Sequence, residues 1–223
     1  MKIFLKKIMP NFIFAFVKTF STLINFNHHY GIFNSIYNSK PINSINKPVP
    51  WITFPAIDYL SKFDFSDKTI FEFGSGQSTL FWAERFSEVI SVESDKEWYS
   101  YVKKSLPNNS NVVYQPSLNE YASSIIKTNK QFDVILIDGD CRDECVFSSL
   151  HCLKDNGMLI LDNSEHYSDI TKFLREKGFF QIDFVGYSPL NRFVSVTSVF
   201  IRLTNKIQLN FSDSKPAGGF PIQ

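Results

Sequence analysis

The sequence predicts an α/β fold: a doubly wound, mostly parallel seven-stranded sheet with an antiparallel last strand, plus a helical N-terminal extension. Three observations predict it. Short apolar runs of strand type alternate with helix-type segments between residues 69 and 187, which is typical of βαβ crossovers. Only SPLNRFVS separates the last two strand-type runs, so they should pair as an antiparallel hairpin. Residues 1–57 carry six lysines and no acidic residue, unlike the remainder of the chain.

The main domain is expected to begin at Trp51, where FPAIDYLSKF suggests a short helix. The expected strands are residues 69–73, 88–94, 111–115, 132–138, 157–163, 179–187 and 196–203. The expected helices lie near residues 77–87, 95–105, 117–128, 141–153 and 167–177. We therefore divide the chain into an extension and linker (1–50), a main domain (51–205) and a flexible tail (206–223).

Composition bounds the class of protein. The chain has 223 residues, of which 43% are hydrophobic and 20% charged, so it can bury a core and is not a wholly disordered chain. The net charge of +1 divides into +6 for residues 1–57 and −5 for residues 58–223. The acidic balance of the larger part argues against a broad nucleic-acid surface, and no nucleic-acid partner is expected.

The basic extension is rich in Phe and Ile. Its longest uncharged apolar run is six residues, too short to span a bilayer. We expect a helix or a pair of helices, hinged near Pro10. The aromatic side would lie against the main domain, against a second subunit through residues 1–30, or at a membrane interface. Residues 27–50, rich in Asn, Ser and Pro, read as a linker or a loosely structured lead-in.

The three cysteines lie close together, at Cys141, Cys145 and Cys152. An odd, clustered set is no disulfide framework, which favours a reducing compartment and hence the cytoplasm, with membrane association left open by the extension. Because no CxxC pair is present, we expect buried small hydrophobes rather than zinc ligands.

A glycine turn follows the first expected strand, in FEFGSGQST. Glycines at 74 and 76 would let a ligand approach the backbone, and the helix that follows would offer amide donors. A dinucleotide motif would have a third glycine where Thr79 stands. Glu72 brings a negative charge that disfavours an anion and favours a cationic sulfonium. A tight turn of purely structural purpose would look similar.

The next expected strand ends at Glu93, seventeen residues after Gly76. A parallel strand would bring this carboxylate beside the glycine turn, where it could accept hydrogen bonds from two ribose hydroxyls. A solvated acid at a strand end is the alternative. Taken together, the turn and the acid predict a nucleoside-containing ligand.

Four motifs, EFGSGQS, SVES, FDVILIDGD and GMLILDN, resemble class I S-adenosylmethionine-dependent methyltransferases over roughly residues 52–203. The resemblance implies a Rossmann-like domain that transfers a methyl group to an oxygen or nitrogen of a small molecule or glycan. An NAD-dependent oxidoreductase and a non-catalytic scaffold of the same fold remain alternatives. The cofactor-binding residues that the resemblance implies are Glu72, Gly74, Ser75, Gly76 and Ser78 near the methionine part, Glu93 at the ribose, Ser117 near the adenine, and Asp138.

Polar residues follow the fourth and fifth expected strands and should meet at one edge of the sheet. They are similar to a set in metal-dependent small-molecule O-methyltransferases related to catechol methyltransferase. That likeness implies Mg²⁺ or another divalent cation on Asp138, Asp162 and Asn163. Cys141 stands where that family has a lysine base. Alternatively, Asp138 contacts the cofactor or caps a helix, and the Asp-Asn pair shapes a turn.

His166 and Asp140 are the catalytic candidates at this edge. The unperturbed pKa of histidine lies close to neutrality, which suits a general base. The alternative, which the sequence favours, is a surface histidine that begins the next helix. Arg142 could bind an anionic group of a substrate or pair with Asp143 or Glu144 on its own helix. Residues 51–55 and 187–191 should overhang the crevice as lids, or pack on the sheet edge.

Overall fold

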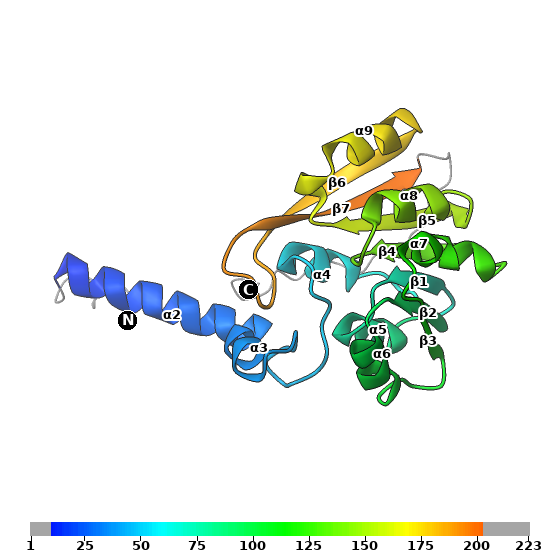
Figure 1. The fold of residues 1–223 in the computed structure, drawn as a ribbon. Coiled ribbons are helices and arrows are strands. Elements are labelled where there is room, and N and C mark those ends of the chain that lie inside the picture. Colours follow the sequence, from blue (N-terminus) through cyan, green and yellow to red (C-terminus); the bar gives the residue numbers. More distant parts are fainter. Residues whose placement is uncertain (1–9, 203–223) are drawn as a thin grey trace.

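The sheet has the expected architecture. The computed structural model describes residues 10–202 and shows a seven-stranded sheet in the order β3-β2-β1-β4-β5-β7-β6 (Figure 1). Strands β1 to β5 pair in parallel, and β7 is antiparallel to both β5 and β6, which confirms the predicted fold class. The strands are β1 Thr69–Phe73, β2 Glu88–Glu93, β3 Ser110–Tyr114, β4 Phe132–Ile137, β5 Leu153–Asp162, β6 Phe179–Gly186 and β7 Ser195–Arg202.

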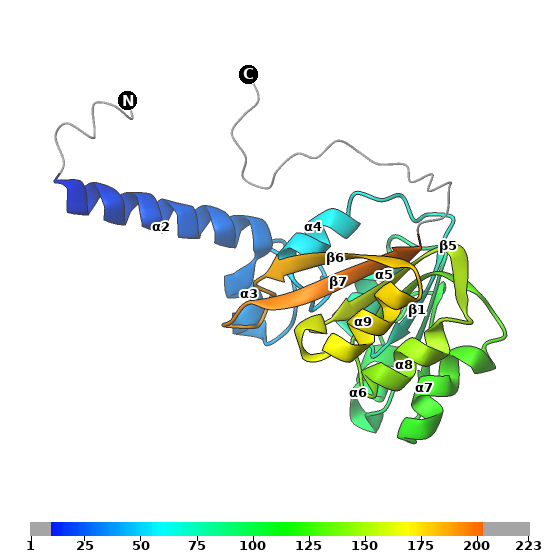
Figure 2. The same cartoon turned by 90° about the horizontal axis from the view of Figure 1, so that it is seen from above.

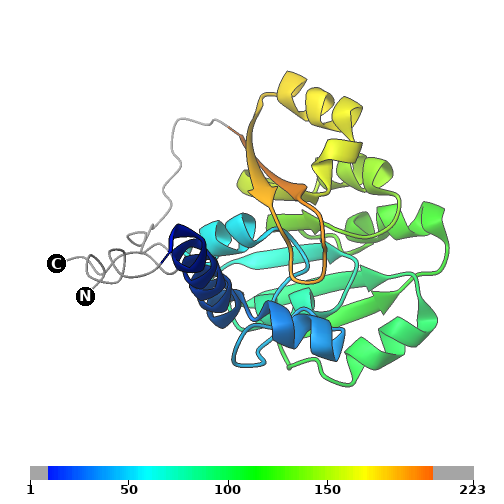
Figure 3. The ribbon, with the colours of Figure 1, turned by 90° about the vertical axis from the view of Figure 1, so that its left-hand side faces the viewer.

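Helix α4 precedes β1, and the other helices of the domain connect successive strands up to β6. Figure 3 shows them on both sides of the sheet. They are α4 Phe54–Leu60, α5 Gln77–Ala83, α6 Lys96–Lys103, α7 Leu118–Lys127, α8 Arg142–Ser149, the 3₁₀ helix η1 Ser164–His166 and α9 Ser168–Glu176. The five helices with predicted ranges begin within one residue of their predicted starts; α5 and α8 end four residues before their predicted ends, and α6, α7 and α9 end one or two residues before theirs.

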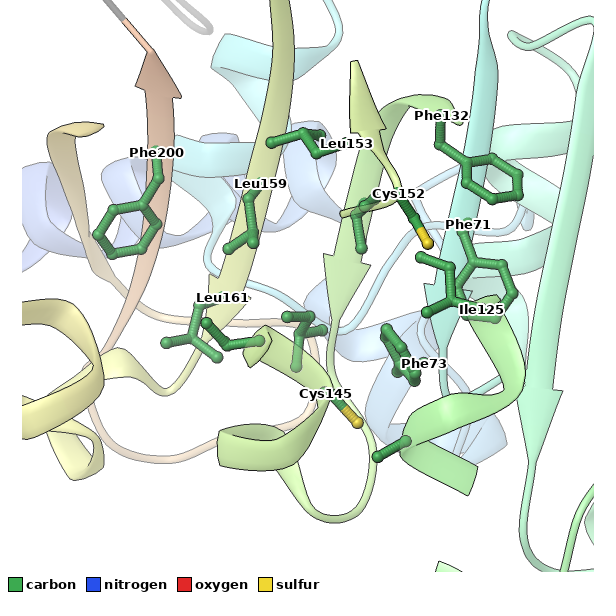
Figure 4. Close-up of a cluster of buried hydrophobic side chains, with 14 of the residues drawn as sticks. Phe71, Phe73, Ile125, Phe132, Cys145, Cys152, Leu153, Leu159, Leu161 and Phe200 are labelled. Atoms are coloured by element: carbon green, nitrogen blue, oxygen red, sulfur yellow. The ribbon is translucent and has the colours of Figure 1, made fainter. Parts of the chain in front are cut away.

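Two apolar clusters cover the two faces of the sheet. Alternation along β1 explains them, because Phe71 and Phe73 point to one face and Ile70 to the other. On the first face they pack with residues of α7, α8 and α9, among them Ile125 and Cys145 (Figure 4). The second face is covered by α4 and α5. Cys145 and Cys152 are buried free thiols, as predicted for small hydrophobes, whereas Cys141 is half-buried.

The segment 27–50 is more ordered than the sequence suggested. Helix α2 (Asn11–Tyr30) runs into it, and α3 (Ile32–Asn38) follows after Gly31, whose φ of 69° turns the chain. The Tyr30 hydroxyl donates to Asp58 at 2.7 Å, and the two rings of Tyr30 and Phe54 lie 4.2 Å apart. The prediction of a loose linker is therefore wrong for residues 27–38, whereas residues 39–50 form turns with one isolated bridge between Ile42 and Pro48.

The error has a physical cause. The Asn and Ser residues that signalled a loop make local hydrogen bonds that order the chain. The buried Ser35 hydroxyl donates to the Ile42 carbonyl at 2.6 Å and accepts from the Ile42 amide at 3.1 Å. Of the remaining terminal predictions, a helix does follow Pro10, while the expected segment before Pro10 and the tail 206–223 lie outside the described residues.

Candidate functional site

The turn after β1 passes against the turn after β4. The Gly74 amide donates to the Val92 carbonyl at 3.0 Å, and the residue has a φ of 98°. A Cβ atom at this position would lie 3.0 Å from the Asp138 carbonyl oxygen. Only glycine meets both conditions, so Gly74 is required by the close approach of the Asp138 backbone, while its predicted role at a ligand stays a prediction.

Glu72 lies buried beneath this turn and ties it to α5. Its carboxylate accepts a hydrogen bond from the Thr79 hydroxyl at 2.6 Å, and Thr79 in turn accepts from the Gly76 amide at 3.0 Å. Burial raises the pKa of Glu72 to about 7, although hydrogen bonds from Ser78 and Thr79 oppose the rise. Thr79, which the sequence marked only as a missing glycine, thus fixes the start of the helix.

Glu93 ends β2 with its carboxylate held on both oxygens. Oε1 accepts the backbone amides of Ser94 at 2.9 Å and Asp95 at 3.0 Å. Oε2 accepts the Ser75 hydroxyl at 2.8 Å, which links the second strand to the glycine turn. The side chain is therefore fixed in one orientation at the carboxyl edge of the sheet.

A cavity of about 260 Å³ opens at this edge, where β1, β2 and β4 end. Three carboxylates reach it, and neither lysine nor arginine is among its lining residues, so its charge suits a cation and disfavours a pyrophosphate. The lining residues are Gly74, Ser75, Glu93, Ser94, Trp98, Tyr121, Asp138, Gly139 and Asp140.

Two aromatic residues of this cavity were missed by the sequence analysis. The indole N–H of Trp98, on α6, donates to the Ser75 carbonyl at 2.7 Å and braces the glycine turn. The Tyr121 hydroxyl, on α7, lies so close to Gly139 that any Cβ atom there would overlap it. Gly139 in FDVILIDGD was a signal for such an approach, but nothing in the sequence said which helix would supply the neighbour.

Of the three predicted metal ligands, Asp138 and Asn163 bind Arg142 through their side chains and Asp162 does so only through its backbone. Its Nη2 donates to Asp138 Oδ1 at 3.1 Å, and its Nη1 donates to Asn163 Oδ1 at 3.3 Å and to the backbone oxygen of Asp162. Its Nε donates to the Gly139 carbonyl at 3.0 Å. The guanidinium thus joins the ends of β4 and β5, instead of pairing with its helix neighbours or facing a substrate.

The carboxylate of Asp162 points elsewhere. It is buried and accepts the Thr197 hydroxyl of β7 at 2.6 Å. Burial raises its pKa to about 6, and burial together with Asp162 raises the pKa of Asp138, with Arg142 opposing the latter rise. Since a guanidinium takes the oxygens of Asp138 and Asn163, this donor set does not fit a divalent cation. Among residues 10–202, moreover, no group of three or more His, Cys, Asp or Glu side chains is arranged to hold a metal.

Comparisons with known proteins bear on the fold. No family model and no curated protein matches the sequence. A precorrin-6y C5,15-methyltransferase from Geobacter metallireducens matches in structure with a TM-score of 0.55 at 12% identity, over 66% of this chain and 87% of that one. An O-methyltransferase from Bacillus cereus, solved in complex with SAH, matches with a TM-score of 0.53 at 14% identity, over 60% and 74%. The chain has the class I methyltransferase fold.

The remaining predicted site residues are divided between the cavity and the surface outside it. Asp140 lines the cavity and accepts the Ser94 hydroxyl at 2.5 Å. The His166 side chain is 73% exposed in η1 and is not among the lining residues. Ser117 is the exposed N-cap of α7, also outside the lining. The candidate lids meet each other, since the Phe54 amide donates to the Tyr187 carbonyl at 2.8 Å.

Proposed function

We propose that the protein binds S-adenosylmethionine in the carboxylate-lined cavity and transfers its methyl group to an oxygen or nitrogen of a small molecule or glycan. The observation that carries this proposal is the cavity itself, in which Glu93, Asp138 and Asp140 meet at a glycine turn. When bound, the cofactor supplies a methyl group on a positively charged sulfur.

The residues of the cavity fit such a ligand. Glu93, fixed by the amides of residues 94 and 95, is oriented to accept hydrogen bonds from vicinal ribose hydroxyls. Arg142 pairs with Asp138 alone, so Glu93 and Asp140 leave the cavity with a negative charge that suits the sulfonium and ammonium groups of the methionine part. The same charges work against the alternative of a dinucleotide, whose pyrophosphate would meet the unpaired carboxylates of Glu93 and Asp140 and no lysine or arginine in the lining.

Catalysis would come mainly from positioning the acceptor against the cofactor. Asp140, oriented by the Ser94 hydroxyl, is the residue on the cavity wall that would take the proton of the nucleophile. His166, close to the end of β5, would serve an acceptor that extends beyond the cavity. No step requires a divalent cation, because Arg142 already neutralises Asp138.

Isothermal titration tests the binding half of the proposal. S-adenosylmethionine and its demethylated product should both bind, NADH should not, and EDTA should leave the affinities unchanged. Absence of binding by both sulfur ligands would refute the proposal, and binding of NADH alone would favour the oxidoreductase.

Methyl transfer from labelled cofactor to a panel of hydroxyl and amine acceptors, glycans included, tests the catalytic half. Asp140→Asn should lower turnover far more than cofactor affinity, and His166→Gln should do so only if the histidine contacts the acceptor. Cofactor binding without transfer to any member of the panel would favour the scaffold alternative.

A further inference from the structure

Helix α2 projects away from the methyltransferase fold. It is 20 residues long, about 30 Å at the usual helical rise, and none of its residues is buried (Figure 2). Its last turn is anchored, because Phe26 and Tyr30 contact the Phe54 ring at 6.0 and 4.2 Å. The preceding turns stand clear of the sheet and its helices in Figures 1 and 2.

One half of this helix is a continuous apolar face. At 100° per residue, seven large apolar side chains share one side, while Asn11, Lys18, Thr22, Asn25 and His29 share the other. All seven are exposed, with Phe12 at 80%, Phe16 at 64% and Phe20 at 56%. The apolar face consists of Phe12, Ile13, Phe16, Val17, Phe20, Leu23 and Ile24. Such a stripe on a protruding helix marks a surface that binds something.

The charge of the N-terminal segment indicates what binds the apolar face of α2. Lys18 is the one Lys, Arg, Asp or Glu side chain in residues 11–30, and lysines also stand at positions 2, 6 and 7. No acidic residue occurs before Asp58. A second copy of α2 would therefore supply no carboxylate for these lysines, whereas an anionic lipid surface supplies phosphates. Phe and Leu on one face with lysine on the other is typical of helices that lie in a membrane interface.

We infer that α2 docks the protein on an anionic membrane surface by inserting its apolar face between the headgroups. It lies in the interface rather than crossing it: within residues 10–202, no helix is both long and apolar enough to span a bilayer. Each lysine brought near such a surface strengthens binding about fivefold, and the inserted aromatic rings supply the larger share.

The docked helix also places the candidate site. Phe54, on which Tyr30 packs, donates its amide to the Tyr187 carbonyl, just past the end of β6 at the carboxyl edge of the sheet. Lys40 lies over the Tyr101 ring at 5.3 Å, and Tyr101 stacks on Trp98 of the cavity wall. The base of the extension therefore adjoins the edge that carries the cavity, and a membrane-borne acceptor would reach it directly.

Co-sedimentation of the full chain with vesicles tests the inference. Vesicles of equimolar phosphatidylcholine and phosphatidylglycerol should bind the protein, and pure phosphatidylcholine should bind it at least about tenfold more weakly. The double variant Phe16→Ser, Phe20→Ser should lower partitioning onto the mixed vesicles by more than about tenfold. The matched control Phe147→Ser, Phe180→Ser changes two exposed phenylalanines elsewhere and should bind as the parent does.

Equal partitioning of both double variants would overturn the inference, as would equal binding to neutral vesicles or no binding at all. Light scattering of the same samples tests the other possible partner of the apolar face, a second copy of the chain. A dimer that Phe16→Ser, Phe20→Ser dissociates, in a protein that ignores vesicles, would assign the face to a second copy. Circular dichroism checks that each variant is folded. None of these measurements depends on the cofactor, so the proposed function can fail while the docking stands.

Discussion

Acidic residues follow parallel strands at two places on the carboxyl edge of the sheet. The groups that bind their carboxylates differ between the two places. After β2, Glu93 is satisfied by backbone amides and a serine hydroxyl, and it faces the cavity. After β4 and β5, Arg142 binds the Asp138 carboxylate, the Asn163 side chain and the Asp162 backbone oxygen. Neutral donors orient a carboxylate and leave its charge for a ligand, whereas a guanidinium both orients and neutralises it. The difference separates a carboxylate whose charge is left for a ligand from carboxylates that the fold uses itself.

Removing the guanidinium should break this comparison most strongly. Arg142→Ala leaves Asp138 partly buried beside Asp162 without its ion pair, and breaking such a pair costs about 3–5 kcal/mol of unfolding free energy. Arg142→Lys, which keeps the charge and loses the planar fork, should cost less. Urea unfolding measures both, with Arg175→Ala as the exposed control, for which a change within about 0.5 kcal/mol is expected. A loss no larger than that of the control would show that Asp138 does not depend on Arg142.

Glu72 is a third kind of acid in this comparison. It is buried from solvent, and its carboxylate accepts a hydrogen bond from Thr79 instead of an arginine. Its pKa, raised by burial from 4.5 to about 7, means that the folded protein binds a proton more tightly than the unfolded chain. Protonation of Glu72 therefore adds about 3 kcal/mol to the unfolding free energy below about pH 4.5, and this stabilisation is lost as the pH rises through about 7. Glu72→Gln should remove this decline.

Unfolding free energies at pH 5 and pH 8 provide the measurement. The advantage of Glu72→Gln over the parent should grow between the two values, whatever the variant costs in lost hydrogen bonds. The control Glu97→Gln, on the exposed first turn of α6, should track the parent. Parallel curves for parent and Glu72→Gln would contradict the raised pKa.

Glu93→Gln probes the binding side of the edge. Loss of charge-assisted hydrogen bonds to the ribose should cost about 2 kcal/mol, or about 30-fold in the affinity for S-adenosylmethionine. Titration calorimetry of this variant and of Glu97→Gln makes the comparison at equal size and charge change. If the cofactor bound the Glu93 variant as tightly as the parent, this residue would have no place at the ribose.

Trp98→Phe should give the smallest effect. The variant keeps an aromatic ring and loses the indole hydrogen bond to the Ser75 carbonyl, worth about 1 kcal/mol. If the brace preorganises the turn, cofactor affinity falls about fivefold. Trp51→Phe, which changes a similarly exposed indole before α4, is the matched control and should leave affinity unaltered. Equal affinities for both variants would make the brace dispensable.

The sequence predicted the sheet well because strand period, helix length and the short final connection are local properties. It predicted the cavity in part, since Glu93, Asp138 and Asp140 follow strands that had to end at one edge. It could not predict that Arg142 would reach back across the turn, because a helix-surface pair and a cross-strand tie have the same local sequence. Trp98 and Tyr121 were missed for the same reason: their partners lie on other elements. The loose-linker prediction was wrong within residues 27–50 because Asn and Ser occur in loops and in ordered turns alike.

The last strand of the described sheet in sequence, β7, lies between β5 and β6, so the sheet cannot be completed before β7 has been synthesised. In the described sheet, β6 pairs with β7 alone, and the Thr197 hydroxyl joins Asp162 of β5 to the Thr53 amide. A growing chain can pair β1 to β5 while it is still on the ribosome, but β6 and the lead-in to α4 must wait for the last strand. Until Ser195–Arg202 emerge, β5 is an open apolar edge. Truncation within the last strand should therefore cause aggregation rather than a mild loss of stability.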